Sequence, residues 1–91
     1  MNICYTSTFE GTFDDFNSVM TELRAEFPGI TDATESAEIK IDKEGWCKVI
    51  TIANVVDFNK MQELMASPKV AEFDEKYNNT DVVYKLSLIH I

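Results

Sequence analysis

Apolar and polar positions alternate along two runs of the chain that flank a short polar segment. Both runs lie within Ser36–Val55, and Asp42–Gly45 separates them. Asp42 can hydrogen-bond to the backbone two residues on, and Gly45 can adopt the left-handed conformation that closes a type I turn with a bulge. The pattern therefore predicts a β-hairpin whose turn sets the strand register.

The predicted register gives the hairpin two unlike faces. One face is apolar and is expected to lie under helices, and its pairs are Ile39 with Val49, Ile41 with Cys47 and Ala37 with Thr51. The other face is mixed, with too much apolar surface for open water, so we expect a partner subunit or a ligand against it. It carries Glu38, Lys40, Trp46, Lys48, Ile50 and Ile52.

The segment before the hairpin predicts a strand and a helix. Asn2–Phe9 is rich in β-formers, and Gly11 ends it. Thr12 is a good N-cap with Asp15 as its capping-box partner. The apolar residues that follow recur at helical spacing until Pro28-Gly29. They are Phe13, Phe16, Val19, Met20, Leu23 and Phe27.

The remaining segments connect or complete this unit. Residues 31–35 are predicted as a loop before the hairpin. Asp57 is predicted to cap a second helix, with Val56 packed on Met61, and Ser67-Pro68 to begin a third. Asn78-Asn79 predicts a turn before a last strand over residues 81–86. The second helix is expected to bury Phe58, Met61, Leu64 and Met65.

The element order predicts an α+β fold. It reads β-α-β-β-α-(α)-β, which is the ferredoxin-like plan. Right-handed crossovers then give a four-stranded antiparallel sheet in the order 4-1-3-2 with the helices on one face. All 91 residues are expected to form one domain.

The last six residues, Leu86–Ile91, read LSLIHI. This string resembles the translation of a transposase adapter end used in sequencing libraries. We therefore expect that it replaces the native C-terminus and that His90, the single histidine, is foreign to the protein.

Charge and size restrict the partners. The net charge of −8 disfavours nucleic acid and anionic membranes. No apolar run is long enough to span a membrane and the first residues lack a signal pattern, so we expect a cytoplasmic protein. A chain of 91 residues is marginally stable alone and gains from homodimer formation.

The two cysteines, Cys4 and Cys47, fall in the first and third predicted strands. We expect these strands to be parallel neighbours, with the two thiols close together but reduced. No CxxC or Cys/His cluster is present, so no metal site is expected, and no glycine-rich motif indicates a cofactor. Without His90 the chain also lacks a histidine general base.

The mixed sheet face is the candidate site. One set of side chains from the first strand must join it, either Tyr5 with Ile3 and Ser7, or Cys4 with Thr6 and Thr8. The site is a ligand pocket between two packed sheets, a dimer interface, or both. Its candidate residues are Tyr5, Glu38, Lys40, Trp46, Lys48, Ile50, Ile52, Asn54 and Tyr84.

The element order, the SPKVAEFDEKY segment and the final VVYKL resemble the dimeric α/β-barrel superfamily, including its small antibiotic-biosynthesis-monooxygenase-like members. The resemblance implies homodimers that pack sheet faces together. It leaves two functions open: a structural module or one that binds a small apolar or aromatic molecule, and a cofactor-independent monooxygenase-like enzyme acting on an aromatic substrate. Trp46, Tyr5, Tyr84 and Asn54 match the residue types of such enzymes, but no catalytic residue is assigned.

Overall fold

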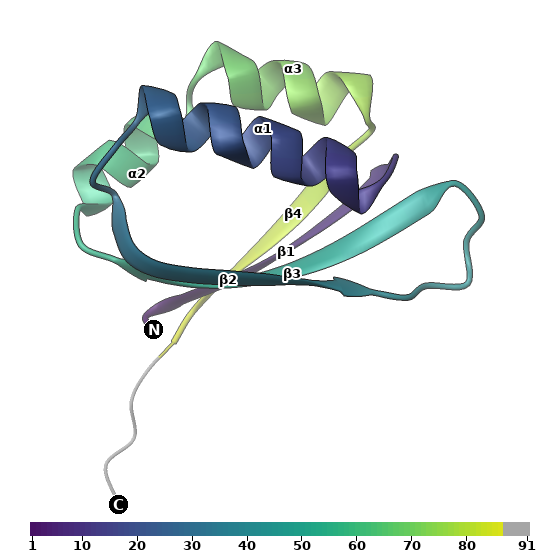
Figure 1. The fold of residues 1–91 in the computed structure, drawn as a ribbon, viewed down its shortest axis with the longest axis horizontal. Coiled ribbons are helices and arrows are strands. Elements are labelled where there is room, and N and C mark those ends of the chain that lie inside the picture. Colours follow the sequence, from purple (N-terminus) through teal and green to yellow (C-terminus); the bar gives the residue numbers. More distant parts are fainter. Residues whose placement is uncertain (87–91) are drawn as a thin grey trace, which may run out of the picture.

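One antiparallel sheet carries all the helices on a single side (Figure 1). The structure is a computed structural model and describes residues 1–86. The strand order is β2-β3-β1-β4, which is the predicted order seen from the other edge, so the predicted fold class is confirmed. The elements are β1 (Ile3–Glu10), α1 (Phe13–Glu26), β2 (Thr31–Ile39), β3 (Trp46–Val55), α2 (Phe58–Met65), α3 (Pro68–Lys76) and β4 (Thr80–Lys85).

Each helix begins at the residue that the sequence predicts. Thr12 and Asp15 form the reciprocal capping box of α1. The Asp57 carboxylate accepts from the backbone N–H of Lys60 at 3.0 Å, and the Ser67 hydroxyl accepts from that of Val70 at 3.4 Å. These side chains satisfy N–H groups that a helix cannot pair internally, so local chemistry fixes the three starts.

The core lies between the helices and the sheet. An aromatic cluster forms where β1, α1 and α3 meet, with Phe9, Phe16 and Phe73 buried together beside Cys47 and Val49. A second cluster of Ile3, Ile30 and Val55 lies farther along the sheet. Leu23 is buried as the stripe on α1 predicts, whereas Met20 is only half-buried.

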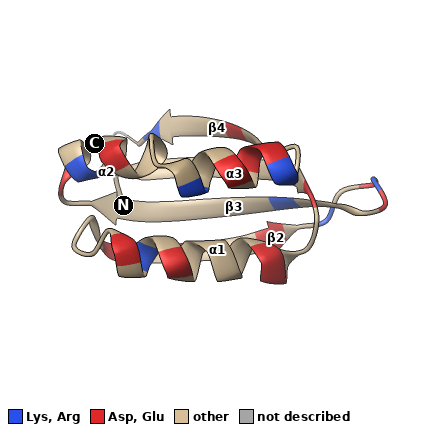
Figure 2. Ribbon diagram, turned by 90° about the horizontal axis from the view of Figure 1, so that it is seen from above, with Lys and Arg blue, Asp and Glu red and all other residues tan. Residues whose placement is uncertain are grey.

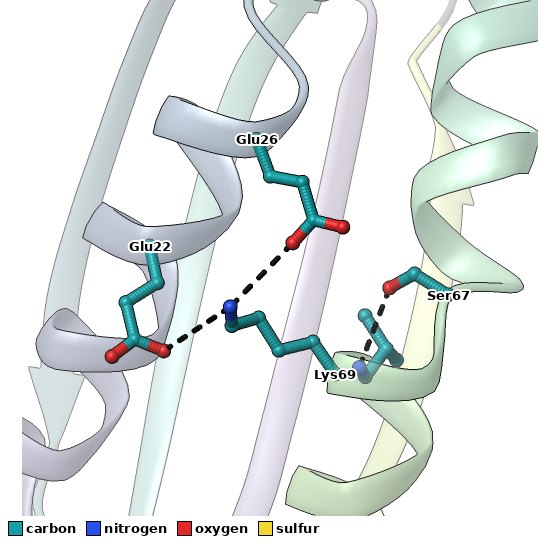
Figure 3. A network of polar contacts seen from close by, with 5 residues as sticks. Glu22, Glu26, Ser67 and Lys69 are labelled. Atoms are coloured by element: carbon teal, nitrogen blue, oxygen red, sulfur yellow. Dashed lines mark hydrogen bonds and ion pairs between the residues drawn. The ribbon is translucent and has the colours of Figure 1, made fainter.

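An ion-pair network joins the outer helices. Figure 2 shows acidic segments along both α1 and α3, and the Lys69 ammonium lies between two carboxylates of α1. Its Nζ atom is 3.8 Å from Glu22 and 3.5 Å from Glu26, as Figure 3 shows. Exposed pairs of this kind contribute little free energy each, but this one offsets repulsion between two acidic helices.

The hairpin register differs from the prediction by one residue. Glu38, not Ile39, lies opposite Val49, and Ile39 lies opposite Lys48. A shift of one residue moves every side chain of β2 to the other face, so Ala37 and Ile39 leave the helix side. Gly45 does adopt positive φ, but the strands separate at Ile39, and Ile41 lies in the connection, so the predicted turn is too short.

Two further expectations about the strands are wrong. Residues 31–35 form the start of β2 rather than a loop, because they pair with the end of β3. Strands β1 and β3 are antiparallel, not parallel as expected. The chain runs in the same direction in β1 and β2, and the hairpin after β2 reverses it in β3. Cys4 therefore pairs with Ile52 while Cys47 pairs with Phe9, and the two free thiols lie apart on opposite faces.

Within residues 1–86, no helix is long and apolar enough to cross a membrane. We expected Leu86–Ile91 to be foreign to the protein. Residues 87–91 of this segment lie outside the part of the chain that the structure describes.

Candidate functional site

Three hydroxyl side chains form a row across the helix-covered side of the sheet. Thr51 on β3 is the register partner of Tyr5 on β1 and of Ser36 on β2. The Ser36 and Thr51 hydroxyl oxygens are 2.8 Å apart. Ser7 lies in the next row and is as deeply buried as Thr51. Burying polar groups costs free energy unless they are hydrogen-bonded, so a polar row that runs from the exposed Ser36 at the sheet edge to the buried Thr51 marks a candidate site.

A cavity of about 400 Å³ opens above this row, between the sheet and the helices. This volume lies within the range of small-molecule pockets, and the walls are mostly apolar, as in such pockets. The side chains that line it include Ile3, Phe16, Val19, Met20, Leu23, Phe27, Ala53, Met61, Leu64, Val70, Phe73 and Val83.

The Tyr5 hydroxyl is the polar group best placed in this cavity. It donates to the thioether sulfur of Met20 at 3.5 Å. Burial raises the pKa of Tyr5 above its usual value, and the negative charge of Asp81 acts in the same direction. The Thr51 side chain lowers the pKa, with an effect smaller than that of burial but larger than that of Asp81, and the charge of Arg24 lowers it least. The phenol therefore remains protonated at neutral pH and is a hydrogen-bond donor.

An acidic corner closes the cavity where α3 leads into β4. The Asn79 amide donates to the Asp74 carboxylate at 2.8 Å and to that of Asp81 at 2.9 Å. Its backbone N–H also donates to the Asp74 carbonyl, which fixes the turn after Asn78, where φ is +52°. Asp74 and Asp81 both line the cavity, and Asp81 is the register partner of Ser7.

Helix α2 forms an open side of the cavity. The sequence predicts that its four large apolar side chains are buried, but α2 contains no buried residue. Phe58 is 50% exposed and Met65 45% exposed, while Met61 and Leu64 are half-buried beside the Ile3 cluster. All four line the cavity, so the apolar stripe faces empty space where the prediction expected packed core.

The residues predicted for the mixed face divide into two groups. Trp46, Lys48, Ile50, Ile52 and Asn54 alternate with the buried positions of β3, so they lie on the helix-free face of the sheet. Tyr84 of β4 lies there too, opposite Cys4. This brings six of the nine candidates together, and the set from β1 that joins them is Cys4, Thr6 and Thr8.

The other three candidates are elsewhere. Tyr5 lies on the helix side, as described above. Glu38 also lies there, because of the register shift, and its carboxylate accepts from the Cys47 thiol at 3.4 Å. Burial and this carboxylate raise the pKa of Cys47 to about 11, so the thiol is inert at neutral pH. Lys40 lies in the connection between β2 and β3.

Sequence reasoning named Tyr5 as a candidate but missed the other polar residues that line the cavity. Ser7 and Thr51 interrupt the apolar helix-facing positions of β1 and β3, between Tyr5 and Phe9 and between Val49 and Ala53. A polar residue at an inward position is a usable signal once the faces of the strands are known. Asp81 gave no such signal, because a carboxylate at the start of a strand is ordinary.

Comparison with known proteins identifies the fold. No family model and no curated protein matches the chain. Among solved structures, SnoaB, a cofactor-independent oxygenase from Streptomyces nogalater, superposes with a TM-score of 0.58 at 14% identity and covers 97% of this chain and 95% of its own. A putative antibiotic biosynthesis monooxygenase from Deinococcus radiodurans superposes with a TM-score of 0.54 at 14% sequence identity. The match covers 98% of this chain and 97% of the monooxygenase.

The same fold also forms part of a larger protein whose name indicates a different activity. A formyltetrahydrofolate deformylase from Pseudomonas putida superposes with a TM-score of 0.58 at 12% sequence identity. The match covers 92% of this chain and 28% of the deformylase. These likenesses confirm the ferredoxin-like fold that the sequence predicts. Because one fold serves many chemistries, the function must be argued from the cavity.

Proposed function

We propose that this protein is a homodimer that binds a small, mainly apolar or aromatic molecule in the cavity between its helices and its sheet. The observation that carries the proposal is the cavity of about 400 Å³, with apolar walls and the Tyr5 hydroxyl inside it. Such a space matches the size and polarity of sites for ring-shaped ligands.

The proposed ligand site differs from the one expected from the sequence. The sequence suggested a ligand between two sheet faces, but the cavity lies on the helix side of the sheet. The helix-free face is then available for a second copy of the chain. Of its apolar side chains, Tyr84 is 53%, Val82 45% and Ile39 37% exposed, and Ile50 and Ile52 are half-buried.

A second copy is the occupant that best suits this face. A two-fold axis places the same surface on both sides of the interface, so its charges must be self-complementary. Lys48 and Glu35 both lie on this face, on neighbouring strands. A two-fold arrangement can therefore pair opposite charges around a central apolar contact of Ile50 and Ile52.

The ligand proposal is tested by thermal unfolding with α-tetralone, a bicyclic aromatic ketone. At tenfold excess over its Kd it should stabilise the protein by about 1.4 kcal/mol and raise Tm by about 6–10 °C. Ala53→Met, which places a flexible side chain in the cavity, should weaken this shift, measured from the Tm of the variant without ligand. An equal shift in both proteins would place the binding elsewhere.

The likeness to SnoaB favours one second candidate, a cofactor-independent oxygenase acting on an aromatic substrate. Its cavity would hold the substrate, and Tyr5 and Asp81 would be the nearest groups able to exchange protons with it. Incubation of bound phenolic aromatics in air, followed by mass spectrometry, separates the two candidates. Without a cofactor the substrate itself must supply two electrons, so a product that has gained one oxygen atom and lost two hydrogen atoms, with the other oxygen atom of O2 released as water, supports the enzyme. Unchanged ligand supports the binding module.

A further inference from the structure

Strand β4 is an open edge of the sheet. Within the described residues it pairs with β1 on one side and has no strand on the other. In Figure 2 it runs along one side of the molecule, beyond α3. Val82, Val83 and Tyr84 are each roughly half exposed, although successive residues of a strand face opposite sides of the sheet. The outer N–H and C=O groups of β4 are therefore accessible to another strand.

The sequence of β4 is complementary to itself when two copies run antiparallel. With Val83 opposite the partner's Val83, Val82 lies opposite the partner's Tyr84 and Asp81 opposite the partner's Lys85. Directly opposed residues share a face of the sheet, and a two-fold axis repeats each pair at the other end of the contact. One register therefore brings apolar side chains together at the centre and an Asp–Lys pair at each end.

The other edge of the sheet is unsuited to a second copy. Strand β2 also ends the sheet, and its residues from Asp32 to Ile39 are exposed. The strand carries Asp32, Glu35 and Glu38 but no basic residue. Two such strands side by side would bring like charges together, which opposes pairing. The charge patterns of the two edges therefore differ, and that of β4 favours a second copy.

We propose that two copies of this chain associate through their β4 strands, paired antiparallel about Val83. This contact is separate from the proposed sheet-face dimer. It places the partner's Lys85 beside Asp81, so a second copy adds a cation to the acidic corner of the cavity formed by Asp74 and Asp81. Pairing of two six-residue strands is a small contact, so it should be weaker than the sheet-face contact and form at higher protein concentrations.

Disulfide crosslinking of concentrated protein tests the register. Directly opposed β-carbons lie about 4.5–5.5 Å apart, and diagonal neighbours about 7–8 Å. Under mild oxidation Val83→Cys should therefore form covalent dimers at least about fivefold faster than Val82→Cys, whose two cysteines would lie diagonally. The wild type, with Cys4 and Cys47 free, gives the background rate. Equal rates for the two variants, or background rates for both, would overturn the proposal.

Charge exchange in the Val83→Cys protein tests the Asp–Lys pairs. Lys85→Glu places like charges opposite each other and should slow crosslinking, and Asp81→Lys should do the same. A mixture of these two variants restores opposite charges at both ends, so mixed dimers should form at a rate near that of Val83→Cys alone. Lys60→Glu makes the same change in net charge at an exposed position of α2 and should leave the rate unchanged.

Two results would contradict the charge pairing. Lys85 is exposed, so Lys85→Glu should fold, and an unchanged crosslinking rate in this variant would by itself overturn the pairing. Failure of the two folded charge variants to crosslink when mixed would do the same.

Two further variants separate β4 pairing from other contacts. Ile50→Lys alters the sheet face and should leave crosslinking of Val83→Cys intact, whereas its loss would assign the crosslink to the sheet-face dimer and overturn the proposal. Crosslinking that appears only after deletion of residues 87–91 would assign the edge to the chain's own C-terminal segment and would also overturn it.

Discussion

Replacing Phe9 by alanine should destabilise the protein by about 3–5 kcal/mol. Phe9 is completely buried, and its ring centroid lies 6.1 Å from that of Phe16, 5.3 Å from Phe73 and 6.3 Å from Tyr77. Truncation removes the centre of this aromatic cluster and leaves a cavity between β1 and the helices. Because small domains have only about 5–15 kcal/mol of stability, the variant should be close to unfolding.

Urea unfolding followed by circular dichroism measures this effect, at one fixed protein concentration because the protein is proposed to dimerise. Phe13→Ala is the matched control: this ring stacks on Phe16 at 6.4 Å but is only half-buried. Phe13→Ala should lower the free energy of unfolding by clearly less than Phe9→Ala does. Similar losses for the two variants would show that the aromatic cluster is not the main source of stability.

Replacing Ile50 by lysine should convert the protein from dimer to monomer. Ile50 lies near the centre of the helix-free face, between Thr6 on β1 and Ala37 on β2. A two-fold contact would bring two such lysines together in an apolar interface, where unpaired charges are strongly disfavoured. Sedimentation velocity should show the change, while circular dichroism shows unchanged helix content.

Val56→Lys is the matched control for charge and exposure. Val56 follows β3 and is 57% exposed, but it lies outside the sheet. This variant should remain a dimer. A wild-type protein that sediments as a monomer at high micromolar concentration would contradict the proposed dimer and leave the sheet face without an assigned occupant.

The helices could be predicted closely because their signals are local. Thr12, Asp57 and Ser67 act on N–H groups within three residues, and no distant contact competes with them. The apolar stripe of α1 has a single consistent face, which predicts the burial of Phe16 and Leu23. The stripe of α2 is equally regular, yet Phe58 and Met65 remain exposed, because periodicity shows which side chains share a face and not whether that face is filled.

The hairpin register could not be predicted, because the side chains of β2 make only a small free-energy difference between two alternative registers. On this strand Ala37 and Ile39 occupy one face and Ser36 and Glu38 the other, and all four are exposed at the sheet edge. When neither face is deeply buried, the hydrophobic pattern hardly distinguishes two registers. The bond between Ser36 and Thr51 favours the observed one.

The cavity was missed for a related reason. Its polar groups come from all four strands, from the helices and from the turn before β4, and only the correct register places Ser36, Thr51 and Tyr5 in one row. The sequence analysis assigned ligand binding to the sheet face that bears Trp46. That face holds exposed apolar residues such as Val82 and Tyr84, but the cavity lies on the opposite side of the same strands.

The most direct test of the ligand site is to measure intermolecular nuclear Overhauser effects between α-tetralone and the methyl groups of the protein. Met20 and Ala53 line the cavity, whereas Ile50 and Ile52 lie on the helix-free face of the sheet. We predict contacts to the methyl groups of Met20 and Ala53 and none to those of Ile50 and Ile52. Contacts to the two isoleucines alone would contradict the proposed site and place the ligand on the open face.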